Sequence, residues 1–322
     1  MSKIKLLADR GATALASTNY QYWQKYFDIE PYQDDQRYAP GSAVLIGYTE
    51  SIDHLLHKGY RPIVDHLFDS AQYQTSVLEP NKMTLHAPDW QWINEFRVIR
   101  GLGYQSLSWR DQDSPTKFFL LPMNLKRDIR DTLKNHVQPY LNDSVWSYAQ
   151  EGRFLPDDEF VPGTNKATPV NDRAYRPQWY ADTCFSLVSE SALNTNRMGF
   201  GMKPDQVHCS EKTFKPLAYR HPFVIYGTWH SLQYLRSHGF ETFGEFFEES
   251  YDEEMDTWLR FQKILKVLAA LYQQYKNNGS VLQNSRVKEI TKHNYYRFWD
   301  EPYVTQLFEK QIVWPIINFV ET

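Results

Sequence analysis

Cysteine is scarce in this chain: Cys184 and Cys209 are the only two among its 322 residues. Two cysteines provide neither a disulfide framework nor the repeated pairs of a zinc site. A chain of this kind is expected to fold through its apolar core and to work in a reducing compartment. The sequence therefore predicts a cytoplasmic protein.

Long apolar runs are also missing. No stretch approaches the roughly 20 apolar residues that a membrane-spanning helix needs. The N-terminal segment carries Lys3, Lys5, Asp9 and Arg10 among its few apolar residues, so it does not resemble a signal peptide. We expect a soluble protein with no membrane span.

An excess of positive charge is the third absence. The 35 lysines and arginines stand against 39 aspartates and glutamates, for a formal net charge of −4. No overall basic field attracts nucleic acid, so such binding would need a local basic surface. The nearest to one is formed by Arg97, Arg100, Arg110 and Lys117.

Aromatic residues, in contrast, are abundant, with 10 Trp, 22 Tyr and 19 Phe. Aromatic side chains bury large areas in a core and also line pockets for sugars and nucleobases. Both interpretations stay open from composition alone.

Short apolar strands alternate with amphipathic helices along the chain. Residues 42–48 form the clearest buried strand, and residues 60–66, 117–121, 182–190 and 223–226 follow the same pattern. Such alternation predicts an α/β fold with open, mostly parallel sheets. A chain of this length suits two domains rather than one core. Residues 151–176 lack periodicity and are expected to be a long loop that covers a site.

Three carboxylates follow predicted strand ends, where ligand sites form in open α/β sheets. They are Glu50, Asp111 and Asp113. Each of them taken alone is also typical of a solvated loop. Asp89 precedes a predicted helix and is interpreted as its capping residue.

A charge anomaly marks the stretch from Val207 to Phe243. Residues 210–213 open a short helix, and Lys212 and Lys215 lie in its first turn. The helix dipole is already positive there, so cations are disfavoured. Free backbone N–H groups together with two lysines predict a binding site for an anion such as a phosphate. The alternative is a solvated helix start with no ligand.

The order of motifs in this region resembles a known family. Ser189-Glu190-Ser191 is followed by Ser210-Glu211-Lys212-Thr213 and then by the strand Pro222-Phe223-Val224-Ile225. This arrangement resembles the nucleotide-sugar domain of fucosyltransferase-like glycosyltransferases. Residues 232–243 are similar to glycosyltransferase-like proteins of large viruses and phages. The resemblance covers roughly residues 182–266, and the segment with Asn124, Arg127 and Arg130 resembles the one that opens the second domain.

The resemblance implies a GT-B architecture, in which two Rossmann-like domains face each other across a cleft. Residues 1–122 would form the acceptor-side domain and residues 123–300 the nucleotide-sugar domain. Residues 301–322 would form a C-terminal helix and tail that can pack back on the first domain.

The resemblance further implies how a nucleoside-diphosphate sugar would be held. Charge on the leaving diphosphate would be stabilised by Lys212 and the helix N-terminus rather than by a metal ion. Glu211 would accept hydrogen bonds from ribose or sugar hydroxyls, and Glu190 would do the same or order Lys212. The implied donor site comprises Glu190, Ser210, Glu211, Lys212, Lys215, Arg127, Arg173, Arg176 and Gly227. No metal and no cofactor beyond the donor is expected.

An inverting transfer needs a carboxylate base from the opposite domain, and Glu50, Asp111 or Asp113 would supply it. The acceptor would be a glycan or a hydroxymethylated pyrimidine in phage DNA; a viral enzyme would work in the host cytoplasm. The first half departs from the family pattern, because a His-x-x-Glu motif is not evident. A non-catalytic nucleotide- or glycan-binding module is therefore the alternative. A glycoside hydrolase ranks last, since no pair of carboxylates supports it.

Overall fold

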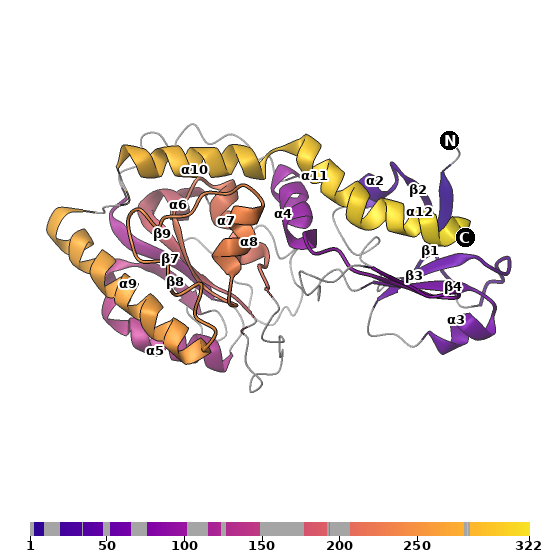
Figure 1. Cartoon of the computed structure of the whole chain (residues 1–322), viewed down its shortest axis with the longest axis horizontal. Helices are drawn as coiled ribbons and strands as arrows, with labels where there is room; N and C mark the ends of the chain where they lie inside the picture. The colour runs from indigo at the N-terminus through magenta and orange to yellow at the C-terminus, as the bar shows by residue number, and fades with distance from the viewer. Residues whose placement is uncertain are drawn as a thin grey trace. The chain divides into compact units, whose positions relative to one another are not determined.

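The computed structural model forms two compact units (Figure 1). The first comprises Met1–Val98 with Glu301–Thr322, and the second comprises Ile99–Asp300. The structure describes residues 3–9, 20–33, 35–47, 52–65, 76–101, 115–123, 127–148, 177–191, 193, 207–279, 282 and 284–322. Within this part of the chain the fold is α/β with two mostly parallel sheets, as the alternating pattern predicts.

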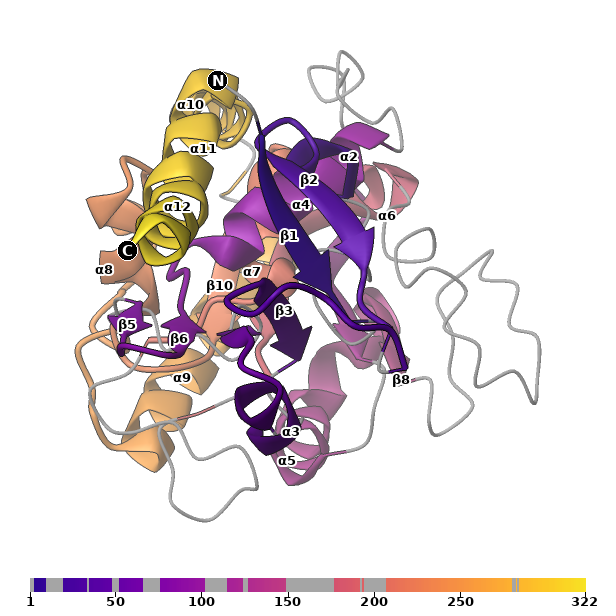
Figure 2. The same cartoon turned by 90° about the vertical axis from the view of Figure 1, so that its right-hand side faces the viewer.

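The first unit contains a sheet of order β2-β1-β3-β4-β6-β5 (Figure 2). All neighbouring strands are parallel except the pair of β5 and β6. Buried side chains from β1, β3 and the following helix, including Leu7, Val44 and Leu55, form a core beside this sheet. The strands are β1 (Ile4–Ala8), β2 (Phe27–Pro31), β3 (Ala43–Gly47), β4 (Arg61–Asp65), β5 (Val77–Leu78) and β6 (Met83–Leu85).

Helices from both ends of the chain belong to the first unit. They are α2 (Tyr20–Trp23), α3 (Asp53–His57), most of α4 (Trp90–Gly101), α11 (Glu301–Phe308) and α12 (Trp314–Glu321). The C-terminal helices are tied to the unit by a hydrogen bond of 3.0 Å from the Tyr22 hydroxyl to Thr305. A π-helical turn, Glu309–Val313, joins α11 to α12. It places Gln311 against Asp89, whose backbone N–H donates to Gln311 Oε1 over 3.1 Å.

The second unit contains a fully parallel sheet of order β10-β9-β7-β8. Its strands are β7 (Lys117–Met123), β8 (Val145–Tyr148), β9 (Thr183–Ser189) and β10 (Phe223–Tyr226). The chain passes from β7 to β8 and then returns to place β9 on the other side of β7. The strand order therefore reverses between β7 and β9, which is the point where open α/β sheets bind ligands.

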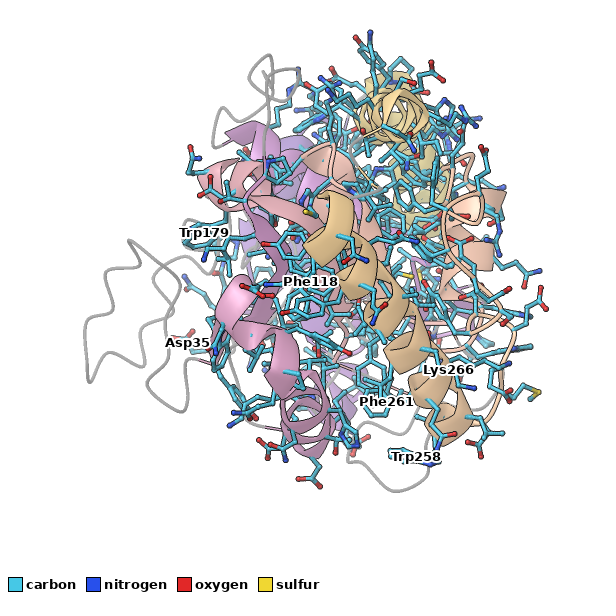
Figure 3. The ribbon with its side chains drawn as sticks, turned by 90° about the vertical axis from the view of Figure 1, so that its left-hand side faces the viewer. Asp35, Phe118, Trp179, Trp258, Phe261 and Lys266 are labelled. Carbon is cyan, nitrogen blue, oxygen red and sulfur yellow. The ribbon has the colours of Figure 1, made fainter. Side chains whose placement is uncertain are left out.

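Helices cover both faces of the second sheet (Figure 1). On one face lie α5 (Asp128–Val137) and α9 (Thr257–Asn278), which enclose Phe118 and Phe261 (Figure 3). The other helices are α6 (Pro177–Asp182), α7 (Glu211–Ala218), α8 (Ser231–Ser237) and α10 (Ser285–Phe298). Cover on both faces explains why every residue of β9 is buried.

Several sequence predictions are wrong in detail. Residues 117–121 were expected in the first domain, but they belong to β7, which pairs with β8 and β9 in the second sheet. A strand can pair with segments that are distant in the sequence. An apolar run predicts the strand itself but does not show which strands will be its neighbours. The strand β2 is not among the predicted strands, and its sequence FDIEP carries two acids.

The buried stripe of the longest helix also differs from the prediction. Apolar spacing along residues 252–275 predicts Met255, Trp258 and Leu259 on a buried stripe, but half of the Trp258 surface is exposed (50%). Figure 3 shows Trp258 near the end of α9. Asp256 caps α9 by accepting from the N–H groups of Trp258 and Leu259, so these two residues lie in the first turn of the helix.

Among the helices that the structure describes, none has the length and apolar character to cross a bilayer.

Candidate functional site

Residues predicted from three separate stretches meet at one edge of the second sheet. Because all four strands are parallel, their carboxyl ends lie along the same edge. Arg127 follows β7, Glu190 follows β9 and Gly227 follows β10. The Arg127 guanidinium donates to the carbonyl oxygen of Ser191 over 3.3 Å, so the ends of β7 and β9 are joined where the strand order reverses.

Glu190 lies at the centre of this edge with none of its surface exposed. Its carboxylate accepts from the N–H of Ser210 at 2.9 Å and from the Thr213 hydroxyl at 2.7 Å. The Ser210 hydroxyl donates to the other carboxylate oxygen. The sequence left open whether Glu190 binds hydroxyls of a ligand or orders Lys212. In the structure its partners are the first residues of α7, which it holds in place.

Ser210 is the N-cap of α7, as the Ser-Glu-Lys-Thr motif indicates. Its hydroxyl oxygen accepts from the N–H of Lys212 over 3.3 Å. Two N–H groups of the helix start, those of Ser210 and Lys212, therefore already have protein acceptors. The predicted anion site combined free backbone N–H groups with two lysines, and these two N–H groups are not free to bind an anion. The charged side chains become more important for such a site.

Lys212 donates from Nζ to three acceptors: Glu211 Oε1 at 2.7 Å, and the hydroxyls of Ser191 and Ser210, each at 3.1 Å. Burial opposes the charge of Glu211, but the nearby charges of Lys212 and Lys215 outweigh it and hold the pKa of Glu211 well below its ordinary value. Glu211 therefore stays ionised. Part of the compensation that the two lysines require comes from this carboxylate rather than from a bound anion.

Arg130 lies off the apolar face of its helix in the sequence pattern, which predicts a solvated side chain. That prediction is wrong, since 3% of its surface is exposed. Burial, followed by repulsion from Arg127, lowers the pKa of Arg130, while Glu211 and Glu190 act in the opposite direction. The guanidinium thus lies within electrostatic range of both carboxylates. Arg130 follows Arg127 by three residues, a spacing that places both on one side of a helix. The sequence alone did not show which residues bury Arg130.

We call these residues the α7 cluster: Arg127, Arg130, Glu190, Ser191, Ser210, Glu211, Lys212 and Lys215. Four cationic side chains stand against two carboxylates, so the cluster carries two positive charges in excess. An anion of charge about −2 would balance them, and guanidinium and ammonium groups are the usual partners of phosphate oxygens.

Two further residues, His208 and Thr228, lie at this edge of the sheet and were not predicted as site residues from the sequence. His208 approaches the carboxylate of Glu190, with 4.0 Å between His208 Nε2 and Glu190 Oε2. The backbone N–H of His208 donates to the Thr228 hydroxyl over 2.8 Å, which ties the segment before α7 to the loop after β10. Neither residue belongs to a periodic pattern, so no local signal marked them.

The remaining predicted site residues are outside the part of the chain that the structure describes. They are the candidate bases Glu50, Asp111 and Asp113 and the candidate donor-site arginines Arg173 and Arg176. In the described ranges, no three His, Cys, Asp or Glu side chains are grouped so as to hold a metal ion.

Comparisons of the chain with protein-family models, with curated proteins and with solved structures find no match. The functional argument therefore depends on the geometry of the α7 cluster.

Proposed function

We propose that this protein is a glycosyltransferase that moves a sugar from a nucleoside-diphosphate donor to an acceptor hydroxyl. The α7 cluster would bind the diphosphate. One observation carries the proposal: an excess of positive charge, organised around the buried Glu190, lies where the order of the second sheet reverses.

The chemistry asked of this cluster is stabilisation of the leaving group. Charge develops on the diphosphate as the bond to the sugar breaks, and preorganised cations in a buried site stabilise it. Lys212 would exchange its contact with Glu211 for a phosphate oxygen. The released Glu211 carboxylate would then accept from two neighbouring ribose or sugar hydroxyls.

The proposal includes a GT-B arrangement, inversion at the sugar carbon and independence from metal ions. Three carboxylates were candidates for the base that deprotonates the acceptor: Glu50, Asp111 and Asp113. Asp111 and Asp113 fall within the bounds of the second unit, which holds the α7 cluster, so a base from the opposite unit would be Glu50. The acceptor would be a glycan or a hydroxymethylated pyrimidine in phage DNA. The net charge of −4 supports the glycan more than the DNA.

A thermal-shift screen of the full chain with UDP, GDP, ADP, CDP and TDP tests the binding step. A nucleotide at a hundred times its Kd stabilises the folded state by about 2.7 kcal/mol. We expect one nucleoside diphosphate to raise the melting temperature, and Lys212→Ala to remove most of the effect. Lys266→Ala, on the outer side of α9 (Figure 3), is the matched control and should behave as the parent chain.

Release of nucleoside diphosphate from its sugar conjugate, measured with glycan and DNA acceptors, tests the transfer step. Stabilisation without turnover on any acceptor would favour the non-catalytic binding module. No response to any of the five nucleotides would eliminate the proposal.

A further inference from the structure

A second polar site lies in the same unit, in a cavity of about 510 Å³. It opens between the start of α8 and the loop before α9, and it is lined by His230, Gln233, Arg236, Asp252 and Glu253. None of these side chains is apolar. The volume lies within the roughly 300–1,000 Å³ that small-molecule sites occupy. The diphosphate site proposed above uses none of these residues.

The walls of the cavity are held rigidly. Asp252, with 2% of its surface exposed, accepts from the N–H groups of Leu232 at 2.8 Å and Gln233 at 2.9 Å. Arg236 bridges two carboxylates, with 3.3 Å to Glu249 and 3.5 Å to Asp252. These bonds leave the Gln233 amide and the Glu253 carboxylate as the groups best able to bind a ligand, since neither is engaged by another described side chain.

The rim of the cavity carries an unusual backbone conformation. His230 has a φ of 61°, in the left-handed region that residues with a side chain disfavour. Its N–H donates to the carbonyl oxygen of Asp252 over 2.9 Å, and its ring stacks on Trp229 with 3.5 Å between the ring centroids. Backbone strain of this kind persists where the surroundings enforce it and is concentrated at ligand sites.

The lining selects a class of ligand by exclusion. An apolar ligand would displace water from the charged ends of the lining side chains without replacing its hydrogen bonds. A phosphate would face two carboxylates, Asp252 and Glu253, against one arginine. Amide, guanidinium and carboxylate groups each present paired donors or acceptors, which match neighbouring hydroxyls.

We propose that this cavity binds the ring of a neutral sugar. Two sources share that chemistry, a free glycan and the sugar of a nucleotide donor. His230 follows Gly227 by three positions, and Thr228 is bonded to His208 next to the α7 cluster. That the cavity binds a sugar does not depend on the proposed function. That this sugar belongs to a nucleotide donor does depend on it.

Ligand-observed NMR and calorimetry on the full chain test the inference. The probes are the methyl glycosides of glucose, galactose and fucose, then UDP and GDP, then UDP-glucose, UDP-galactose and GDP-fucose. The test variants are Gln233→Ala and Glu253→Gln, and the matched controls are the exposed Gln273→Ala and Glu289→Gln. We expect at least one sugar to bind, and Gln233→Ala to weaken it about threefold to tenfold, the value of one lost hydrogen bond.

The methyl glycosides and the nucleotide sugars distinguish a free glycan from the sugar of a nucleotide donor. A methyl glycoside whose affinity falls in Gln233→Ala but not in Gln273→Ala supports a free glycan. A nucleotide sugar that binds more tightly than its nucleotide, with the gain lost in Gln233→Ala, supports the donor sugar. Sugar binding without nucleotide binding retains this inference and eliminates the proposed function. The inference is overturned if no probe shows a sugar contribution, or if that contribution is unchanged in both test variants.

Discussion

Gly227 passes the side chain of Glu190 so closely that a Cβ on Gly227 would lie 3.1 Å from Glu190 Cγ and 3.1 Å from Ile225 Cγ2. The backbone N–H of Glu190 also donates to the carbonyl oxygen of Tyr226 over 2.9 Å. The end of β10 therefore packs directly on the carboxylate that orders α7. Space rather than backbone conformation favours glycine at this position, since its φ is not in the left-handed region.

Gly227→Ala is expected to lower the free energy of unfolding by about 1–3 kcal/mol, the usual effect of overpacking a tight site. Glu190 cannot move away easily, since Ser210 and Thr213 hold it. Urea denaturation measures the change. Gly101→Ala is the control, because no atom lies within 4 Å of its added Cβ, and it should be neutral or stabilising. Equal effects of the two substitutions would contradict the close contact.

Glu190→Ala is expected to reduce stability by about 3–5 kcal/mol, because it leaves buried donors without their charged acceptor. Glu190→Gln retains one acceptor oxygen and should lose less. Glu289→Ala, with 67% of its side chain exposed, should stay within about 0.5 kcal/mol of the parent chain. Urea denaturation of the three variants measures these changes in the free energy of unfolding. A Glu190→Ala chain as stable as the parent would show that the Glu190 carboxylate is not needed to hold the start of α7.

Arg130→Met separates ligand binding from folding. Burial, followed by repulsion from Arg127, disfavours the Arg130 charge and lowers its pKa, so methionine at this position should destabilise the ligand-free chain less than Glu190→Ala does. The same change should weaken nucleoside diphosphate binding about tenfold or more, since it removes one charge-assisted contact. Calorimetric titration measures the affinity, with Lys266→Met as control. An unchanged affinity would exclude Arg130 from the diphosphate site.

Asp143 should contribute a part of the folding stability that is lost as the pH falls into the acid range. Hydrogen bonds from Tyr272 and Lys276 lower its pKa below the ordinary value. A lowered pKa in the folded state means that the stabilisation is complete above the unfolded pKa of about 3.9 and is lost as pH falls through the folded value.

Asp143→Asn should therefore lower stability by about 0.5–1 kcal/mol near pH 7, and the difference from the parent chain should disappear as the pH falls through the lowered pKa of Asp143. Tyr272→Phe removes the same hydrogen bond and should show a similar dependence. Thermal unfolding across this pH range checks both, and a difference that persists in acid would contradict the assignment.

Local patterns were sufficient for most strands of both sheets. The continuous apolar runs at residues 42–48, 182–190 and 223–226 correspond to β3, β9 and β10. The helix start at residues 210–213 was also predicted correctly, since its N-cap serine acts within one turn. Prediction was wrong for Trp258 and Leu259, because apolar spacing along a helix does not show where the surface beneath it ends.

The sequence by itself determined which residues end the strands and begin the helices, because these choices depend on neighbours a few positions away. Only the tertiary structure decided that β7 belongs to the second sheet and that Arg130 is buried. It also decided that Glu190 holds a helix start twenty residues away. Strand pairing and burial are set by segments distant in the chain, and no local pattern records which of them will meet.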